Sequence, residues 1–455
     1  MDGDSDLTSR VFRSLRRRFF DVFPALEAPN FRLFLSGQAI SLVGTWMQGP
    51  VMSWVVYDIT KSTAALGWVS FLGQLPMTFL VIAAGVVADR YSRQRIVTVT
   101  QTFLMLSAFA LAALAATDRL TIKWIYLVSF LTGIAQAFDV PARQAFIVQV
   151  AGRKHLGNAI ALNSAMFNTA RIIGPSVGGI VLRYAGAALC FFINGVSFLA
   201  IILALIAMRG IKFAQSLSRA KGHRELIDGL RYVRRHRDIF TILILTAIFS
   251  LFGTYYMTLL PAFARDVYHK SAQEYGLLVS SLGVGALVGA VFMATTSKWA
   301  RQDRWMLVGL GLMSVTLTAL SFVRNYGLAC LFLGMHGFGQ LTFLISGNTL
   351  VQHLADERYQ GRTMAARHFF WGGLMPFGGW IAGHLPALPL ARPLAHVPLF
   401  GGWLEANAPD RLGVRGTVLA GAVILLVTLI TFAPRVLRID MTLLQSPELA
   451  PRAPD

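Results

Sequence analysis

The chain has 455 residues, of which 55% are hydrophobic and only 14% charged, and its formal net charge at pH 7 is +19. Soluble domains carry about 25% charged residues, so this composition excludes an ordinary soluble protein and indicates a surface that mostly contacts lipid. A charge of this sign would suit a nucleic-acid-binding protein, but its distribution along the chain favours a membrane protein instead.

The opening stretch MDGDSDLTSRVFRSLRRRFF is basic. No apolar core of about 7 to 15 residues with a small-residue cleavage site follows it, so we expect no cleavable signal. An RNA-binding arm is the alternative, but a basic cluster beside a membrane segment more often contacts anionic lipid. We therefore expect residues 1–30 to form a cytoplasmic arm on anionic membrane lipids, with no nucleic-acid partner.

Apolar runs long enough to cross a bilayer, roughly 20 residues each, follow one another along the chain. Backbone groups in hydrocarbon must be paired within the segment, and runs this long and continuous achieve that as helices rather than barrel strands. We predict an all-α membrane protein with twelve transmembrane helices. The runs are 33–56, 64–87, 96–116, 122–142, 159–182, 187–208, 239–262, 275–296, 306–323, 327–350, 364–386 and 415–433.

The basic residues are distributed unevenly between the loops. Most of the 41 Lys and Arg residues fall in the N-terminal arm, the even-numbered loops and the tail 437–455. This asymmetry is the positive-inside pattern, so we expect both termini to be cytoplasmic. Cys190 and Cys330 both lie in apolar runs, so neither a disulfide framework nor a cysteine-based zinc site is indicated.

The longest cytoplasmic loop, 209–238, divides the predicted helices into a half at 31–208 and a half at 239–436. Its stretch RELIDGLRYVRRHRDIF places Leu226, Leu230 and Val233 on one helical face among arginines. This pattern predicts an amphipathic helix on the inner membrane surface, with a solvated linker as the alternative.

A shift of 208 residues aligns DRYSRQR at Asp89 with SKWARQD at Ser297, although the second copy lacks the aspartate at that position. Many secondary transporters consist of repeated halves with a substrate site near the membrane midplane between them. The weak repeat therefore favours a transporter.

Several motifs resemble those of the major facilitator superfamily. GVVADRYSRQR, from Gly85 to Arg95, is similar to the motif of its loop 2-3, and ARIIGPSVGG is similar to the Gly-Pro motif in helix 5 of its exporters. NFRLFLSGQAISLVGTWMQ, FDVPARQAF and LNSAMFNTARIIGP resemble the branch that contains the enterobactin exporter and related multidrug and secretion-type transporters. The resemblance covers roughly residues 28–436 and implies the twelve-helix fold of two six-helix halves.

The resemblance also implies a secondary active transporter of a bacterial inner membrane. We expect proton-coupled efflux of a small organic molecule, such as a siderophore or drug, by a monomer. No phosphate-binding Gly-rich loop, zinc-ligand spacing or nucleophile elbow occurs, so we expect no enzyme and no cofactor. The alternatives are transport of another substrate such as a metal ion, which the lack of a His-rich loop disfavours, and a non-transporting scaffold.

Asp89, Arg90, Arg93 and Arg95 gather in the first cytoplasmic loop. Arginines here would be anchored in the inner headgroups, and a topology signal alone would account for them. It would not account for Asp89. The resemblance implies that this motif stabilises the outward-facing state by ion pairing, so we expect Asp89 to act as a conformational latch.

Charges inside a membrane must pair or face a cavity. In predicted helix 4, Asp139 and Arg143 are four residues apart on one face, so a local pair and a relay to the arginines of the Asp89 loop are both open.

In predicted helix 5, Arg171 precedes the Gly-Pro motif by one turn. We interpret it as structural, with a role in binding an anionic or catechol-type substrate as the alternative. Gly174, Pro175 and Gly178 are expected to bend the helix and let a neighbour approach closely.

Polar side chains at helical spacing mark the expected substrate cavity, because helices 1, 4, 7 and 10 line it in the superfamily that the chain resembles. Interhelical hydrogen bonding is the alternative role. The expected cavity residues are Gln38, Ser41, Thr45, Gln48, Gln136, Thr246, Ser250, Thr254, His336 and Gln340.

Asp139 and His336 are the candidates for proton coupling. Arg143 favours the charged form of Asp139, whereas a histidine changes charge near physiological pH in ordinary surroundings. We expect both residues to take part.

Overall fold

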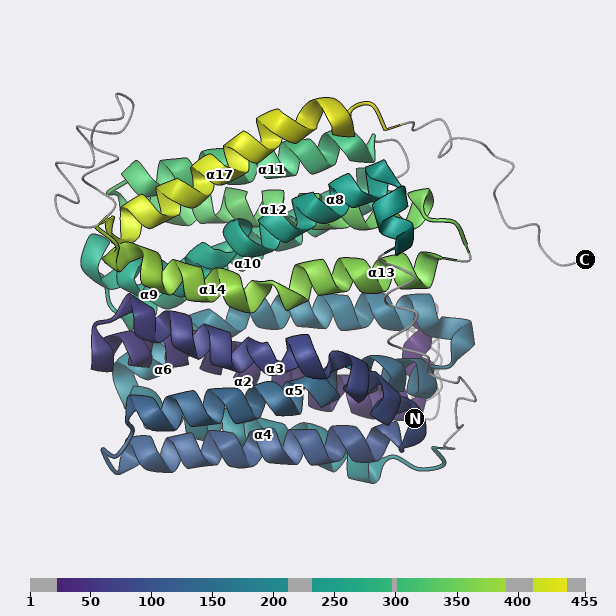
Figure 1. Ribbon diagram of the computed structural model, residues 1–455. Coiled ribbons are helices and arrows are strands. Elements are labelled where there is room, and N and C mark those ends of the chain that lie inside the picture. The colour runs from purple at the N-terminus through teal and green to yellow at the C-terminus, as the bar shows by residue number, and fades with distance from the viewer. Residues whose placement is uncertain (1–22, 212–230, 297–300, 358, 390–411, 440–455) are drawn as a thin grey trace, which may run out of the picture. The chain divides into compact units, whose positions relative to one another are not determined.

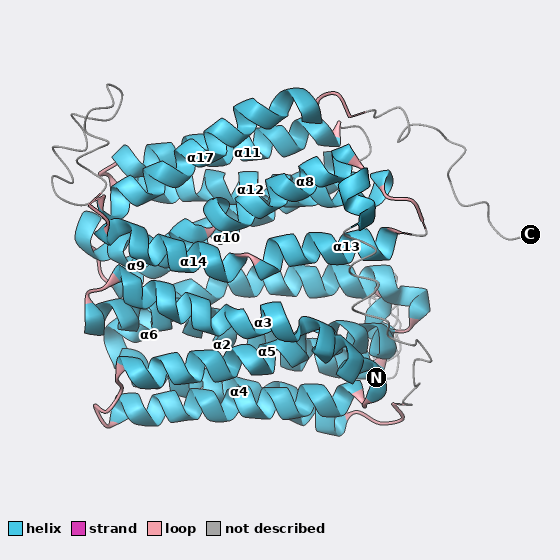
Figure 2. Cartoon of the chain, in the orientation of Figure 1, coloured by secondary structure: helices cyan, strands magenta, loops and turns pink. Residues whose placement is uncertain are grey.

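The computed structural model describes residues 23–211, 231–296, 301–357, 359–389 and 412–439. Every regular element in these ranges is a helix (Figure 2). Most of the basic arm, the residues Leu226 and Leu230 of the amphipathic face, the repeat copy at Ser297 and the end of the tail lie outside the described residues.

The chain forms two compact units, and two helices contribute to both. The first unit contains residues up to Met52 and from Phe79 to Ala220. Helix α2 (Pro29–Thr60) begins in this unit, and helix α3 (Thr63–Arg90) ends in it. The segment Ser53–Thr78 groups with the second unit, which continues from Lys221.

The first unit also contains α4 (Arg93–Ala116), α5 (Ile122–Ala151) and α6 (Leu156–Ala207), and α4 packs on the other two. With 52 residues, α6 is far longer than a bilayer requires. Gly186 interrupts it with a φ of 77°, a conformation that glycine adopts readily. This break lies between the apolar runs that end at 182 and begin at 187, so α6 consists of two helices.

The second unit contains a longer series of helices, and α12 packs between α10 and α11 while α11 also packs on α17 (Figure 1). The elements are α8 (Arg237–Ile248), η3 (Phe249–Gly253), η4 (Tyr255–Leu259), α9 (Leu260–Ala262), η5 (Phe263–Val267), α10 (Ala272–Thr296), α11 (Gln302–Phe322), α12 (Tyr326–Leu354), α13 (Gln360–His368), η6 (Phe369–Gly373), α14 (Met375–His384), η7 (Leu385–Ala387) and α17 (Gly413–Val436).

Two of the predicted helices are irregular. The run 239–262 begins in α8 and includes the π-helical turn η3, the π-helical turn η5 follows directly after the end of this run, and the run 364–386 includes the π-helical turn η6. The η3 and η6 turns contact each other. Single π-helical turns inside helices occur frequently at functional sites, and the apolar pattern gave no sign of them.

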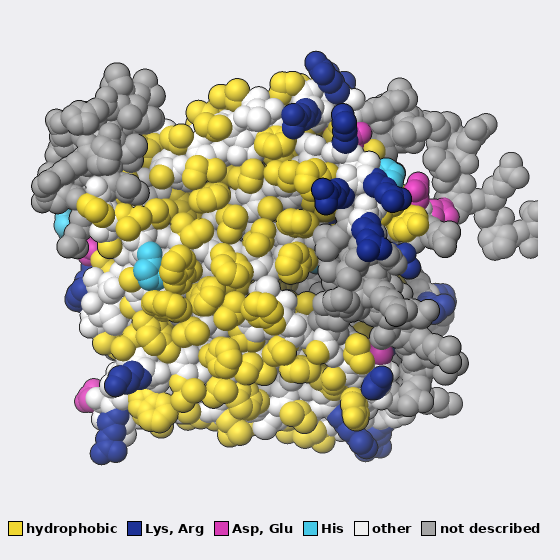
Figure 3. Space-filling model, viewed as in Figure 1, with side chains coloured by type: hydrophobic (Ala, Val, Ile, Leu, Met, Phe, Trp, Pro, Cys, Tyr) yellow, Lys and Arg dark blue, Asp and Glu magenta, His cyan; other side chains and the backbone are white. Residues whose placement is uncertain are grey.

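The described part of the chain contains nine helices that are long and apolar enough to cross a membrane. On the face drawn in Figure 3, hydrophobic side chains cover the middle of the helices, whereas Lys and Arg gather near helix ends. Large hydrophobic side chains lie on the surface, and those of Phe79 and Ile206, for example, are 70% and 68% exposed. Together these features describe a helical membrane protein.

Candidate functional site

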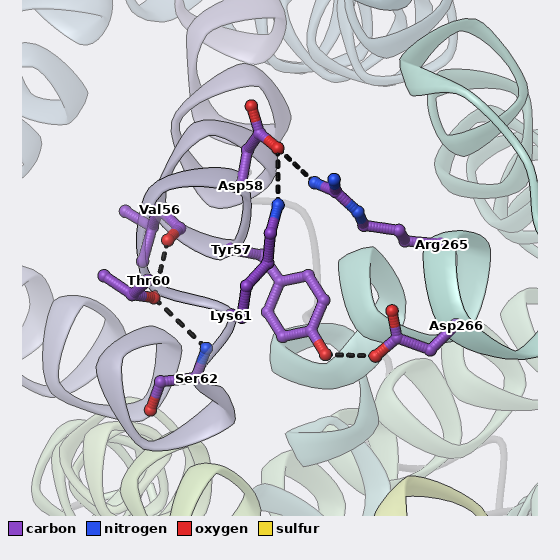
Figure 4. Close-up of polar contacts among 8 residues, drawn as sticks. All are labelled: Val56, Tyr57, Asp58, Thr60, Lys61, Ser62, Arg265 and Asp266. Atoms are coloured by element: carbon purple, nitrogen blue, oxygen red, sulfur yellow. Dashed lines mark hydrogen bonds and ion pairs between the residues drawn. The ribbon is translucent and has the colours of Figure 1, made fainter.

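A cluster of charged and aromatic side chains joins the end of α2 to η5 within the second unit (Figure 4). Arg265 donates to the carboxylate of Asp58, and Lys61 Nζ donates to the same carboxylate oxygen at 2.7 Å. Beside them the hydroxyl of Tyr57 donates to Asp266. We call these five residues the Asp58 cluster, which holds two segments more than 200 residues apart in sequence together by ion pairs and a charge-assisted hydrogen bond.

A glycine-lined contact continues from the Asp58 cluster along α3 and α14. A Cβ on Gly383 would lie 2.6 Å from the Cα of Gly67, and a Cβ on Gly379 would lie 3.0 Å from the Cβ of Ser70. Real Cβ atoms do not approach this closely, so the two backbones meet where only glycine fits. Farther along α3, Thr78 Oγ1 donates to the carbonyl of Gly373 at 3.3 Å.

The sequence analysis missed the Asp58 cluster. Asp58 and Lys61 follow the apolar run that ends at 56, and Arg265 and Asp266 follow the run that ends at 262. The available signal was a pair of opposite charges just beyond each of two apolar runs. Nothing in the sequence showed that these two ends contact each other.

Asp139 is buried at 2% exposure and accepts hydrogen bonds from two helices. Thr100 Oγ1 and Gln101 Nε2 from α4 lie 2.8 and 2.9 Å from its Oδ1, and Arg143 Nε lies 3.1 Å from its Oδ2. The pair with Arg143 is thus the local one, while both oxygens of the carboxylate have donors that stabilise its negative charge.

The Asp89 loop forms a looser arrangement. Arg93 Nη2 lies 4.0 Å from Asp89, whose side chain is 40% exposed, and Arg93 Nη1 also donates to the carbonyl of Ala145 at 3.4 Å. Arg90 and Arg95 are exposed. The structure therefore connects this loop to α5 at Ala145 rather than at Asp139.

Helix α6 approaches α2 closely at the Gly-Pro motif. A Cβ on Gly174 would lie 2.6 Å from the Cβ of Trp46, and one on Gly178 would lie 3.0 Å from the carbonyl of Met47. Pro175 is buried in the same contact region. These small residues allow the two helices to pack backbone against side chain.

Arg171 precedes this contact by one turn. Its Nη2 donates to Asn168 Oδ1 at 3.1 Å, a partner three residues earlier on the same helix. This bond is a contact within α6.

The polar stripe on α2 divides between buried and exposed positions. Gln38 and Ser41 are 2% and 1% exposed, whereas Thr45 is exposed and donates to the carbonyl of Ser41 at 2.9 Å. Gln48 Oε1 accepts from Asn194 Nδ2 at 2.6 Å, so this side chain contacts α6. The stripe thus contributes interhelical contacts as well as one accessible hydroxyl.

The stripe on the helix-7 stretch is buried throughout. Thr246, Ser250 and Thr254 are at most 5% exposed. Thr246 donates to the carbonyl of Ile242 at 2.8 Å, and Ser250 donates to the carbonyl of Trp371 in η6. Ser250 therefore links the π-helical turns η3 and η6 by an interhelical hydrogen bond.

His336 is fully buried between three helices of the second unit. Its Nε2 lies 3.2 Å from the carbonyl of Gly253 at the end of η3, and its Nδ1 lies 3.2 Å from Thr316 Oγ1 of α11. The ring of Tyr256 packs edge-on at 4.6 Å. Within the described part of the chain, the recorded partners of the imidazole are all uncharged.

Two other expected cavity residues remain accessible: Gln136 on α5 is exposed and Gln340 on α12 is partly exposed. Cys190 and Cys330 are free thiols. Among the described residues, no group of three or more His, Cys, Asp or Glu side chains is arranged to hold a metal ion.

The family model described as transmembrane secretion effector matches residues 21–392. The chain belongs to this family. The resemblance to the major facilitator superfamily is thereby confirmed, and the chain is a transporter of that superfamily.

Curated relatives of this chain include exporters. The multidrug efflux pump Tap of Mycolicibacterium fortuitum is 25% identical over 400 residues, which are 85% of this chain and 91% of that protein. The enterobactin exporter EntS of Citrobacter koseri is 25% identical over 338 residues, 73% of this chain and 80% of the exporter. The staphyloferrin A transporter of Staphylococcus aureus is 23% identical over 295 residues, 64% and 73% of the two chains.

A solved structure shows the same fold. The crystal structure of the nucleoside transporter NupG superposes with a TM-score of 0.68 at 14% identity, covering 91% of this chain and 99% of that one.

Proposed function

We propose that this family member is a twelve-helix exporter built from two six-helix halves. The nine membrane-length helices supply most of the count. Helix α6 counts twice because Gly186 divides it, and α2 and the stretch from α13 to α14 complete the set. The halves would then be 31–208 and 239–436, with the linker between them.

The charge pattern sets the proposed orientation. With both termini in the cytoplasm of a bacterium, the Asp89 loop lies on the cytoplasmic side and the Asp58 cluster lies on the periplasmic side of the inner membrane. A reporter inserted after Tyr91 is expected to be cytoplasmic and one inserted after Ser62 periplasmic. Finding both reporters on one side contradicts this orientation.

The Asp58 cluster is the observation that carries the proposal. In the proposed halves, α2 and α3 belong to the first half, whereas η5 and α14 belong to the second. The ion pair of Arg265 with Asp58 and the glycine contact of Gly67 with Gly383 therefore join the halves at the periplasmic end. Alternating access requires that such a contact opens and closes in every cycle, so we assign it as the outer gate.

A reversible crosslink tests the gate. In a variant with Cys190 and Cys330 replaced by serine, Asp58→Cys and Arg265→Cys place two thiols on side chains that contact each other in the structure, and a reducible bifunctional thiol reagent links them. The crosslink is expected to stop export and a reducing agent to restore it. Each single cysteine variant is the control, and its export should not change when the reducing agent follows the reagent. Unchanged export in the crosslinked protein contradicts the assignment of this contact as the outer gate.

The substrate is proposed to be a small organic molecule such as a siderophore or a drug. Two of the relatives carry siderophore names and one carries the name of a multidrug pump. Compounds retained by cells that lack the protein, compared with cells that contain it, would identify the substrate. Identical profiles in the two cell lines would contradict export.

Protons are the proposed coupling ion, with His336 as the group that changes charge. The hydroxyl of Thr316 is able to donate to Nδ1 of a neutral ring or to accept from Nδ1–H of a charged ring. Its oxygen lies 2.8 Å from the carbonyl of Leu312, which accepts the hydrogen bond of the hydroxyl in the second case. This reversible partner lets the ring gain a proton without losing its hydrogen bonds.

Energised membrane vesicles test the coupling directly. An uncoupler that collapses the proton gradient is expected to abolish uphill transport of the identified substrate. Transport that continues at the same rate with the uncoupler present would return His336 and Asp139 to structural roles.

A further inference from the structure

Among the described residues, one buried arginine in the second unit has no carboxylate partner, unlike several other arginines. Arg367, on α13, is 5% exposed. Its Nη1 donates to Asn348 Oδ1 at 3.1 Å and its Nη2 donates to the carbonyl of Leu344 at 2.9 Å. Its Nε is buried without a hydrogen-bond partner in the structure. Both acceptors are neutral, so neither of them balances the charge of the guanidinium.

Other arginines of the chain are paired with carboxylates. Arg143, Arg265 and Arg301 each contact a carboxylate, at Asp139, Asp58 and Asp303. Among the described residues, no carboxylate lies within ion-pair distance of Arg367. A buried cation without an opposite charge is costly, and intramembrane cations usually mark a substrate or ion pathway. No described side chain supplies the opposite charge, which is what a site for an anion from outside the chain requires.

The guanidinium also retains donors for such a molecule. It carries five N–H groups, and the two recorded bonds leave the buried Nε–H and others unused. The planar fork of a guanidinium matches the two oxygens of a carboxylate. A lysine at this position would supply a point charge without that geometry, so the arginine favours oxyanions that can accept two parallel hydrogen bonds.

The segment beside the start of α13 is rich in arginine. Tyr232 stacks on Tyr359 at 4.3 Å, and Tyr232 Oη accepts from the backbone N–H of Asp356, so the segment around Tyr232 lies beside the start of α13. That segment carries four arginines and reaches α13 through the apolar cluster that includes Val233 and Ala366. Clustered charge of one sign raises the local concentration of opposite ions. The four are Arg231, Arg234, Arg235 and Arg237.

We propose that Arg367 binds the carboxylate or an equivalent oxyanion of the exported molecule, so that the substrates are organic anions. This proposal rests on the proposed export function and names its substrate class. Arg367 lies two residues before η6, the π-helical turn whose Trp371 carbonyl accepts from Ser250 of the helix-7 stretch. Binding at Arg367 is thus placed next to the contact between the two irregular helices.

A binding experiment on the full chain tests the site without requiring transport. The purified protein in phosphatidylcholine nanodiscs is titrated with salicylate, and its thermal midpoint is followed, because a ligand that binds only the folded state raises it. Salicylate is expected to raise the midpoint of the wild type, while its neutral amide, salicylamide, should not. Arg367→Gln is expected to weaken salicylate binding at least about tenfold, the order of magnitude of one lost charged contact.

Two variants keep the result interpretable. Arg367→Lys retains the charge and is expected to bind more weakly than the wild type but better than the Gln variant. Arg362→Gln removes a different cation from α13, one that stacks on Tyr359 at 5.6 Å, and should bind salicylate as the wild type does. Equal binding by wild type and Arg367→Gln overturns the proposal, as does the absence of any salicylate effect on the wild type.

A lipid phosphate is the other source of an oxyanion, and the nanodiscs distinguish it. If phosphatidylglycerol stabilises the wild type more than Arg367→Gln and abolishes the salicylate effect, the site belongs to a headgroup and the proposal fails. Failure of the export function is seen separately, because cells with and without the protein would then retain the same compounds while salicylate still binds at Arg367.

Discussion

Asp139 in the first unit and His336 in the second are both buried and both titratable, yet their partners differ in kind. Asp139 accepts from two neutral donors and pairs with a cation. The partners of His336 are a backbone carbonyl and a hydroxyl that can reverse its hydrogen bond. Partners that only donate hold one charge state, whereas a reversible partner tolerates two. We therefore expect Asp139 to supply a fixed charge and His336 a variable one.

The largest effect is expected from removing the fixed charge. Asp139→Asn leaves the charge of Arg143 partly buried and unbalanced, which should lower the free energy of unfolding by about 3 kcal/mol and slow export at every pH. Denaturant unfolding and vesicle transport measure the two effects.

The matched control is Asp139→Asn combined with Arg143→Gln, which removes both charges. This double variant should recover stability but not transport. If export by Asp139→Asn depends on pH in a new way, the distinction between the fixed and the variable charge is wrong.

The next largest effect is expected from His336, the residue with the variable charge. His336→Gln retains a donor and an acceptor but cannot change charge, so we expect the pH dependence of export to flatten while the protein remains folded. Transport rates across a series of external pH values give the measurement. A profile identical to that of the wild type would exclude His336 as the coupling group.

The partner of His336 sharpens the comparison. Thr316→Val keeps the shape of the side chain but removes the reversible hydroxyl, so we expect the pH profile of export to shift by a smaller amount than in His336→Gln. Thr316→Ser retains the hydroxyl and serves as the control. A shift of equal size in the Ser and Val variants would show that packing, not the hydroxyl, is responsible.

The smallest effect on stability is expected at the Asp89 loop. The 4.0 Å contact with Arg93 is partly exposed, and exposed pairs contribute about 0 to 1 kcal/mol. Asp89→Asn should thus leave the thermal midpoint unchanged while reducing export several-fold, if the loop is a latch. Normal export in this variant would reduce the loop to a topology signal, and Arg95→Gln is the control that leaves the acidic residue in place.

The positions of the helices were predictable because hydrophobic continuity is a local property. The predicted runs closely follow the observed helices, and the gap between two of them falls at Gly186. The π-helical turns η3 and η6 escaped prediction, since their stretches remain as apolar as regular helix.

The candidate site was less predictable because its contacts are tertiary. Spacing four residues apart was enough to pair Asp139 with Arg143. The same reasoning could not show that Gln48 faces Asn194, because a polar stripe does not reveal which helix it meets. Nor could it connect Asp58 to Arg265, which depends on how distant helices pack.

The glycine-lined contact of α3 with α14 has a mechanical consequence for the proposed gate. Gly67 and Gly383 bring two bare backbones together, but aromatic side chains also cross this contact. The ring of Trp68 packs edge-on against Trp380 at 6.3 Å, and the ring of Phe71 packs edge-on against Phe377 at 5.6 Å. Opening the gate therefore separates these rings as well as the ions of the Asp58 cluster. Because salt screens exposed charges but not apolar contacts, a higher ionic strength outside the cell should speed the opening of this gate without removing the resistance that comes from the rings.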